Sequence, residues 1–164
     1  MRKVFFSFHY ETDNWRVNQI KNMDIVEGQK ICNSNDWEKV KLDGDEAIKN
    51  WIDNNMRGCS CLVVLIGSET ASRKWIKYEI KKAWNDGKGV LGIYIHNLKD
   101  QNGRTSRQGR NPFDNFSLNK NNRKLSEIVP VFNPNMFDPY NDIKVNLNKY
   151  IDYAINIRNK IWKN

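Results

Sequence analysis

Short, almost continuous apolar runs alternate along the chain with segments in which apolar residues recur every three or four positions. The runs are rich in β-branched and aromatic residues, which predicts strands, and their lack of polar alternation is typical of strands buried on both faces. The strongest predicted strands are 4–8, 61–66 and 90–95. Two weaker strands are expected at 24–26 and at the proline-broken 128–132. Helices are expected at 13–23 with Asp13 as N-cap, from 43 or 44 to a stop at Gly58, at 72–86 with Ser72 as N-cap, and at 140–162.

This alternation of strands and helices predicts an α/β fold, in which a parallel sheet is covered by helices on both faces. With the strands numbered along the chain, right-handed crossovers favour a five-stranded, flavodoxin-like order, 2-1-3-4-5. A length of 164 residues corresponds to one domain, 1–164. Ligands bind such sheets beyond the carboxyl ends of the strands, here 7–13, 28–45, 67–74 and the loop after His96.

The composition also indicates where in the cell the protein is expected. No apolar run approaches the roughly 20 residues of a membrane span, and the N-terminus lacks the apolar segment of a signal peptide. The three cysteines are an odd number, which favours a reduced, cytoplasmic protein with Cys59 and Cys61 as core thiols. Their spacing relative to the two histidines matches no metal site, so no metal is expected.

The net charge of +8 is uneven, with +2 in residues 1–96 and +6 in residues 97–164. A basic second half is compatible with an anionic partner such as a nucleotide, a nucleic acid or an acidic protein. It is equally compatible with a solvated, lysine-rich surface, because the basic residues are scattered rather than grouped.

Three well-known uses of a doubly wound fold lack their key residues here. Residues 7–13, after the first strand, contain no glycine, which excludes a dinucleotide fingerprint, and Phe8, His9 and Tyr10 are too bulky for a flavodoxin phosphate loop. The strand 61–66 is followed by Gly67 and Ser68 rather than by the aspartate of a receiver domain. A Walker-type Gly-Lys-Ser/Thr is also missing.

One carboxylate lies in an unusual setting. Glu79 follows Trp75 by four residues on a predicted helix, so the two side chains share a face that also carries Ile76 and Ile80. A carboxylate beside an indole in an apolar wall has its pKa raised by desolvation, or it requires a cationic partner. The alternative is an ordinary surface glutamate paired with Lys81 or Lys82.

These segments resemble TIR domains. Residues 3–8 are similar to the opening box of that family, and Ser72-x-x-Trp75-x-x-x-Glu79-Ile80 is similar to its Ser-x-Trp-Cys-x-x-Glu-Leu box, with one extra residue before Trp75. The segments 64–70, 92–96 and 111–113 resemble the TIR-like proteins of bacterial Thoeris anti-phage systems, the ThsB type. The resemblance covers roughly residues 3–155 and implies a TIR-like three-layer sandwich.

The resemblance implies that Glu79 is the catalytic residue of an enzyme that cleaves the nicotinamide–ribose bond of NAD. ThsB-type members are expected to make a cyclic ADP-ribose isomer, a diffusible signal that activates an NAD-depleting effector. NAD is then a substrate, and no cofactor is expected. The chemistry is reasonable, because nicotinamide leaves without a general acid and one carboxylate can stabilise the oxocarbenium-like ribose.

Further positions take binding roles in this interpretation, each with a plainer alternative. Phe6 and Ser7 line the nicotinamide side, although Phe6 can equally be core; His9 and Tyr10 stack or hydrogen-bond, or form a surface turn. Loop residues Trp37 and Asp45 shape the pocket, with Trp37 as an adenine platform or a partner contact. The remaining candidates are Trp75 and Ser68 at the site and Arg73 with Lys74 at the pyrophosphate, where both can also be solvated charges.

Two competing functions remain open at this point. The first is a catalytically silent TIR-like interaction module that associates with itself through the loop 33–45, consistent with a homo-oligomer or a phage-derived trigger as partner. The second is nucleic-acid binding by the basic half, which lacks both a stacking platform and an arginine-rich helix and is therefore not expected.

Overall fold

A four-stranded parallel sheet forms the centre of the computed structural model, which describes residues 1–30, 39–118 and 122–163. The strands are β1 (Val4–Ser7), β2 (Cys61–Ile66), β3 (Gly89–Tyr94) and β4 (Val131–Phe132). They lie side by side in the order β1-β2-β3-β4, and β2 is buried along its whole length between β1 and β3. The α/β fold with a parallel sheet is therefore confirmed.

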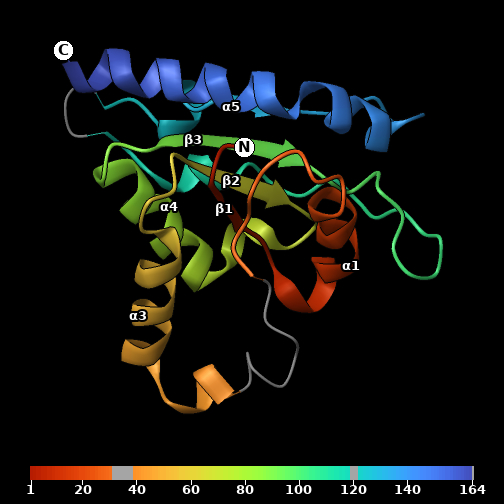
Figure 1. Cartoon of the computed structure of the whole chain (residues 1–164), viewed down its shortest axis with the longest axis horizontal. Helices are drawn as coiled ribbons and strands as arrows, with labels where there is room; N and C mark the ends of the chain where they lie inside the picture. The colour runs from red at the N-terminus through yellow and green to blue at the C-terminus, as the bar shows by residue number, and fades with distance from the viewer. Residues whose placement is uncertain (31–38, 119–121, 164) are drawn as a thin grey trace.

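Helices cover both faces of this sheet (Figure 1). The helices are α1 (Tyr10–Lys21), α3 (Asp45–Met56), α4 (Lys74–Asn85) and α5 (Pro139–Lys163). Val17 and Ile20 of α1 pack with Leu147 of α5 against one face, and Ile52 of α3 packs with Ile80 of α4 against the other. No helix within the described ranges is long and apolar enough to cross a membrane.

Two helices begin at residues other than those expected. The N-cap of α1 is His9 rather than Asp13, which lies inside the first turn, almost fully buried and 3.4 Å from the Arg16 guanidinium. Ser72 belongs to a short 3₁₀ turn, Thr70–Ser72, and its hydroxyl donates to the Glu69 carbonyl, so Arg73 precedes α4 instead. In both cases a tertiary contact or a local turn competes with the capping role that the sequence favours.

The expected five-stranded order 2-1-3-4-5 is not confirmed, because residues 24–26 form no strand. Asp24 has a positive φ of 60°, and the segment contributes only one parallel bridge, Lys3 to Glu27, beside β1. Further along, the Gln29 side chain pairs with the outer edge of β1. Its amide accepts from Phe6 N at 2.8 Å and donates to Phe6 O at 2.6 Å. The Gln29 side chain thus provides hydrogen-bond partners for the N–H and C=O of Phe6 in β1, which a neighbouring strand would otherwise provide.

Replacing Gln29 with methionine is expected to lower the free energy of unfolding by about 2–4 kcal/mol, because a buried backbone N–H and C=O of β1 lose their partner. Urea denaturation measures the loss. Gln101→Met, at an exposed loop position, is the matched control and is expected to leave the midpoint unchanged. Equal midpoints for the two variants would contradict the role assigned to the Gln29 amide.

Candidate functional site

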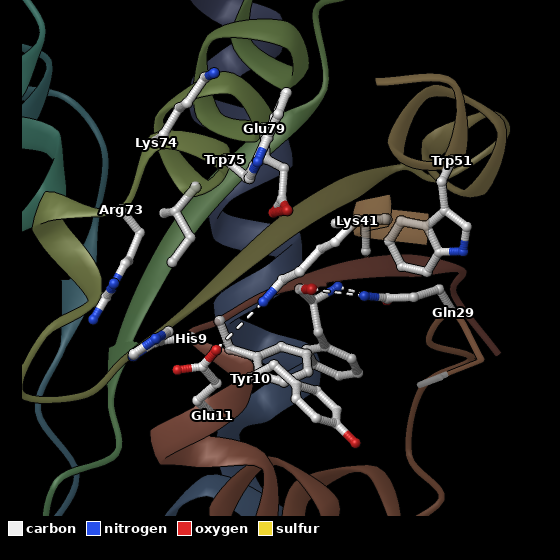
Figure 2. A pocket seen from close by; sticks show the side chains of 14 residues that line it. His9, Tyr10, Glu11, Gln29, Lys41, Trp51, Arg73, Lys74, Trp75 and Glu79 are labelled. Atoms are coloured by element: carbon white, nitrogen blue, oxygen red, sulfur yellow. Dashed lines mark hydrogen bonds and ion pairs between the residues drawn. The ribbon is translucent and has the colours of Figure 1, made fainter. Parts of the chain in front are cut away.

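A cavity of about 270 Å³ lies between the carboxyl end of β1 and the first turns of α4. Residues that follow β1, including His9 and Tyr10, form one wall, and Arg73 to Ile76 form another (Figure 2). Trp51 from α3 and Lys41 complete the rim. We call this cavity the β1–α4 pocket. Its position matches the rule that open α/β sheets bind ligands beyond the carboxyl ends of their strands.

Glu79 places a carboxyl group inside the β1–α4 pocket. The residue lies one helical turn beyond Trp75, and its neighbours Ile76 and Ile80 are buried against the sheet, so the amphipathic pattern of α4 carries Glu79 inward with them. Its side chain is directed from α4 into the pocket (Figure 2). The residue is only 8% exposed.

Burial controls the protonation of this carboxyl group. Desolvation raises the pKa of Glu79 to about 8, and the nearby Ser7 hydroxyl offsets only part of that rise. The surface ion pair with Lys81 or Lys82 is not formed, since Lys82 Nζ instead lies 3.2 Å from Asp86 and 3.9 Å from Asp53. Glu79 is therefore a largely protonated group at neutral pH, held in an apolar wall rather than in an ion pair.

Two neighbouring polar atoms lack well-formed hydrogen bonds here. Across the described ranges, neither Ser7 Oγ nor Glu79 Oε2 makes a hydrogen bond of good geometry, and Ser7 is fully buried. The Ser7 hydroxyl is close enough to the Glu79 carboxyl to offset part of the rise in its pKa that burial causes, but it leaves Oε2 without a firm partner. Most buried polar atoms in proteins are hydrogen-bonded, and each exception carries a desolvation cost. An orphaned carboxyl oxygen facing a cavity is well suited to bind a hydroxyl group supplied by a ligand.

Aromatic rings flank the cavity, and cations lie at its rim. Trp75 is half-buried and contacts Tyr78 edge-on, with 5.7 Å between ring centroids. Trp51 contacts Phe5 in the same way at 6.2 Å. Lys74 Nζ lies 4.9 Å from the centre of the Trp75 ring. Flat apolar walls with cations at the mouth suit a ligand that combines a planar ring with phosphate groups.

His9 is held at the pocket wall by polar contacts. Its Nδ1 lies 2.8 Å from the Thr12 hydroxyl and 3.9 Å from a Glu69 carboxylate oxygen. Burial, followed by the charge of Arg73, lowers the pKa of His9 below its usual value. The imidazole is therefore neutral at physiological pH and adds no positive charge to the pocket.

The structure brings together most, but not all, of the residues expected at the site. Of the expected residues, those that line the β1–α4 pocket are Phe6, His9, Tyr10, Arg73, Lys74, Trp75 and Glu79. Ser7 is buried behind the pocket wall, and Ser68 lines a separate cavity. Asp45 is exposed and pairs with Lys74 at 2.7 Å, so it does not line the pocket. Trp37 lies outside the described residues.

Several lining residues were not named as site residues by the sequence analysis. Among them are Gln29 and Lys41, which lie within the stretch 28–45 expected near the ligand, and Trp51, which lies outside the expected stretches. The helical spacing of Trp51 with Ile48 and Ile52 is the signal of a core residue, and only the packing of α3 beside β1 shows that its ring reaches the pocket. For Gln29 the sequence indicates only the general region 28–45, because its specific role depends on a backbone partner in a distant strand. Within the described ranges, no three His, Cys, Asp or Glu side chains are grouped so that they could hold a metal ion.

Comparison with known proteins identifies the family of this chain. Residues 5–100 match the family described as "Thoeris protein ThsB, TIR-like domain". A Bacillus cereus (strain MSX-D12) protein named "Putative cyclic ADP-D-ribose synthase ThsB1" is 36% identical over 118 residues. The alignment covers 69% of this chain, which spans 62% of the length of that relative. The family match includes β1, β2, β3 and α4, and therefore most of the pocket. The chain belongs to the ThsB family of TIR-like Thoeris proteins.

Proposed function

We propose that this protein binds NAD in the β1–α4 pocket, breaks the nicotinamide–ribose bond, and closes the remaining ADP-ribose into a ring. The product is a cyclic ADP-ribose-type signal that activates an NAD-depleting effector in anti-phage defence. The family membership and the name of the Bacillus cereus relative support this class of reaction. The observation that carries it is the buried carboxyl group of Glu79, orphaned at an aromatic-walled cavity.

The reaction needs one carboxylate and little else from the protein. The C1–N bond between ribose and nicotinamide breaks, and its electron pair goes to the ring nitrogen, so nicotinamide leaves neutral without a proton. The ionised Glu79 carboxylate then faces a ribose that carries developing positive charge, which it stabilises. A hydroxyl oxygen of the adenosine ribose forms the new bond to C1, and its proton passes to Glu79 and on to solvent.

Incubation of the protein with NAD, followed by mass spectrometry of the products, tests the proposal. Nicotinamide and a cyclic product, which has the composition of ADP-ribose less one water molecule, are expected in equal amounts. The same assay in extracts of phage-infected cells covers the phage trigger that the family resemblance implies. If neither preparation releases nicotinamide above a heat-inactivated control, the proposed activity is wrong.

A pH profile of the same reaction is expected to rise with pH and to level off above about pH 8, because only ionised Glu79 stabilises the cationic ribose. The bound nicotinamide ring is positively charged and favours the ionised carboxylate, so the inflection for kcat is expected at a lower pH than that for kcat/KM. Initial rates between pH 5.5 and 9.5, corrected for NAD breakdown without protein, give both curves. A profile that is flat between pH 6 and 9 would argue against Glu79 as the reacting group.

A further inference from the structure

A second cavity, of about 240 Å³, adjoins the first. It lies between the turn Ser68–Arg73, which follows β2, and a segment of the loop after β3 that supplies Arg107 and Arg110. We call it the arginine cavity. Among the described residues that line it, three are arginines and one, Glu69, is acidic. Arg73 lines this cavity and the β1–α4 pocket, so the two hollows meet at its side chain.

The loop that supplies two of these arginines is fixed in place by buried contacts. Arg16 of α1, itself only 4% exposed, donates to Leu98 O at 2.7 Å and to Arg104 O at 3.0 Å. Further along the loop, the backbones of Gly109 and Gly67 touch, and a Cβ atom at position 109 would overlap the Gly67 carbonyl oxygen. Arg107 and Arg110 flank this contact and are therefore held over the turn that follows β2.

The charge of the arginine cavity is not balanced by the protein. The one acidic residue, Glu69, is already engaged, with its carboxylate 3.4 Å from the Arg73 guanidinium and 3.9 Å from His9 Nδ1. In the part of the chain that the structure describes, neither Arg107 nor Arg110 forms an ion pair with an acidic side chain. The guanidinium group binds phosphate through paired hydrogen bonds, which makes an arginine-lined hollow suitable for a phosphate ligand.

The two cavities also complement each other in size. Neither the 270 Å³ of the first nor the 240 Å³ of the second reaches the roughly 300 Å³ at which cavities for drug-sized ligands begin. Together they exceed it. An extended ligand with a ring at one end and phosphates near its middle could occupy both cavities and pass Arg73 on the way.

We infer that the arginine cavity binds the pyrophosphate of a dinucleotide through Arg73, Arg107 and Arg110 while the nicotinamide half occupies the β1–α4 pocket. This inference rests on the proposed function, because it takes NAD as the ligand of the first pocket. The pyrophosphate links the two riboses, so fixing it at the border of the cavities restricts where both can lie. That restriction favours ring closure over attack by water.

Calorimetric titration of the wild type and of the double variant R107A/R110A tests the site. The ligands are ADP-ribose and NAD, which carry the pyrophosphate, and nicotinamide riboside, which carries no phosphate. The double variant is expected to bind ADP-ribose and NAD at least about tenfold more weakly, since two charge-assisted phosphate contacts are lost. Its affinity for nicotinamide riboside is expected to be unchanged. The control, K144A/K149A on exposed positions of α5, removes the same charge and is expected to bind all three ligands as the wild type does.

Several results would overturn the inference. One is that R107A/R110A and the wild type bind ADP-ribose with equal affinity. Another is that the double variant binds all three ligands more weakly by the same factor. A third is that the wild type binds none of the three ligands. If inorganic pyrophosphate binds the wild type as tightly as ADP-ribose does, the cavity is a general anion site, contrary to the inference. If R107A/R110A loses affinity only for single-stranded RNA and not for ADP-ribose or NAD, the arginines form a nucleic-acid surface, again contrary to the inference. Arginine-dependent binding of NAD, with no release of nicotinamide by the purified protein or in extracts of phage-infected cells, would support this site and refute the proposed cleavage. If R107A/R110A releases nicotinamide with the KM of the wild type, the proposed cleavage stands and the pyrophosphate site is refuted.

Discussion

Replacing Glu79 with glutamine is expected to lower the rate of nicotinamide release from NAD by roughly three orders of magnitude, with little change in the affinity for NAD. Glutamine keeps the size and hydrogen-bonding capacity of the side chain but cannot carry the negative charge that faces the developing ribose cation. Removing one preorganised electrostatic group from an active site costs about 10²–10³ in kcat, and loss of the proton acceptor adds to this. Steady-state release of nicotinamide, followed by chromatography, measures the effect.

Glu46→Gln provides the matched control for that experiment. Glu46 has a side chain that is 85% exposed, and its carboxylate lies 3.7 Å from Lys49 Nζ at the surface of α3. The same chemical change there is expected to leave NAD turnover within about twofold of the wild type, since exposed ion pairs contribute little. If Glu79→Gln also retained full activity, Glu79 would have no catalytic role, and the cleavage of NAD would have to depend on another group.

The second large effect of Glu79→Gln is on stability: the substitution that lowers activity is expected to stabilise the folded protein. At pH 8, Glu79→Gln is expected to be more stable than the wild type by about 2–4 kcal/mol, and the difference is expected to shrink toward zero near pH 5. The pKa of Glu79 is raised from 4.5 to about 8 in the folded protein. Between these values the unfolded chain has released its proton and the folded chain retains it. Rising pH therefore favours unfolding of the wild type, by up to about 1.4 kcal/mol per pH unit.

Urea denaturation of both proteins at intervals from pH 5 to pH 9 checks this. Burial also shifts other groups, since it lowers the pKa of His9 and His96 and raises that of Asp13. These groups are present in both proteins, so their contributions cancel in the difference. Parallel curves for the two proteins would show that the Glu79 carboxyl is ionised and well solvated in the native state, contrary to the buried geometry.

The sequence alone predicts the main strands and the position of the acidic residue for physical reasons that operate locally. The segments 61–66 and 89–94 are buried on both faces, and that burial is visible as an unbroken apolar run. Glu79 is predictable because helical periodicity places it among Ile76 and Ile80, whatever surrounds the helix. Such signals depend on residues within one or two turns of each other.

The rest of the site depends on contacts between segments far apart in the chain. Gln29 pairs with β1 only because Phe6 presents its backbone there. Arg107 and Arg73 line one cavity only because a long loop returns to the turn that follows β2. The basic character of residues 97–164 indicates an anionic partner, but scattered arginines do not reveal which of them converge. No local pattern specifies these pairings, so only the folded chain shows them.

The contact between Gly67 and Gly109 sets a limit on how far this protein can diverge or be redesigned. Two bare backbones touch there, and the Asp13 carboxylate fills the space where a side chain of residue 67 would lie. A larger residue at position 109 forces the two backbones apart, whatever its polarity, and one at position 67 has to displace the Asp13 carboxylate. A homologue with alanine at both places must therefore route its long loop differently, and an insertion between residues 98 and 109 is tolerable only if both ends of that stretch still meet their anchors.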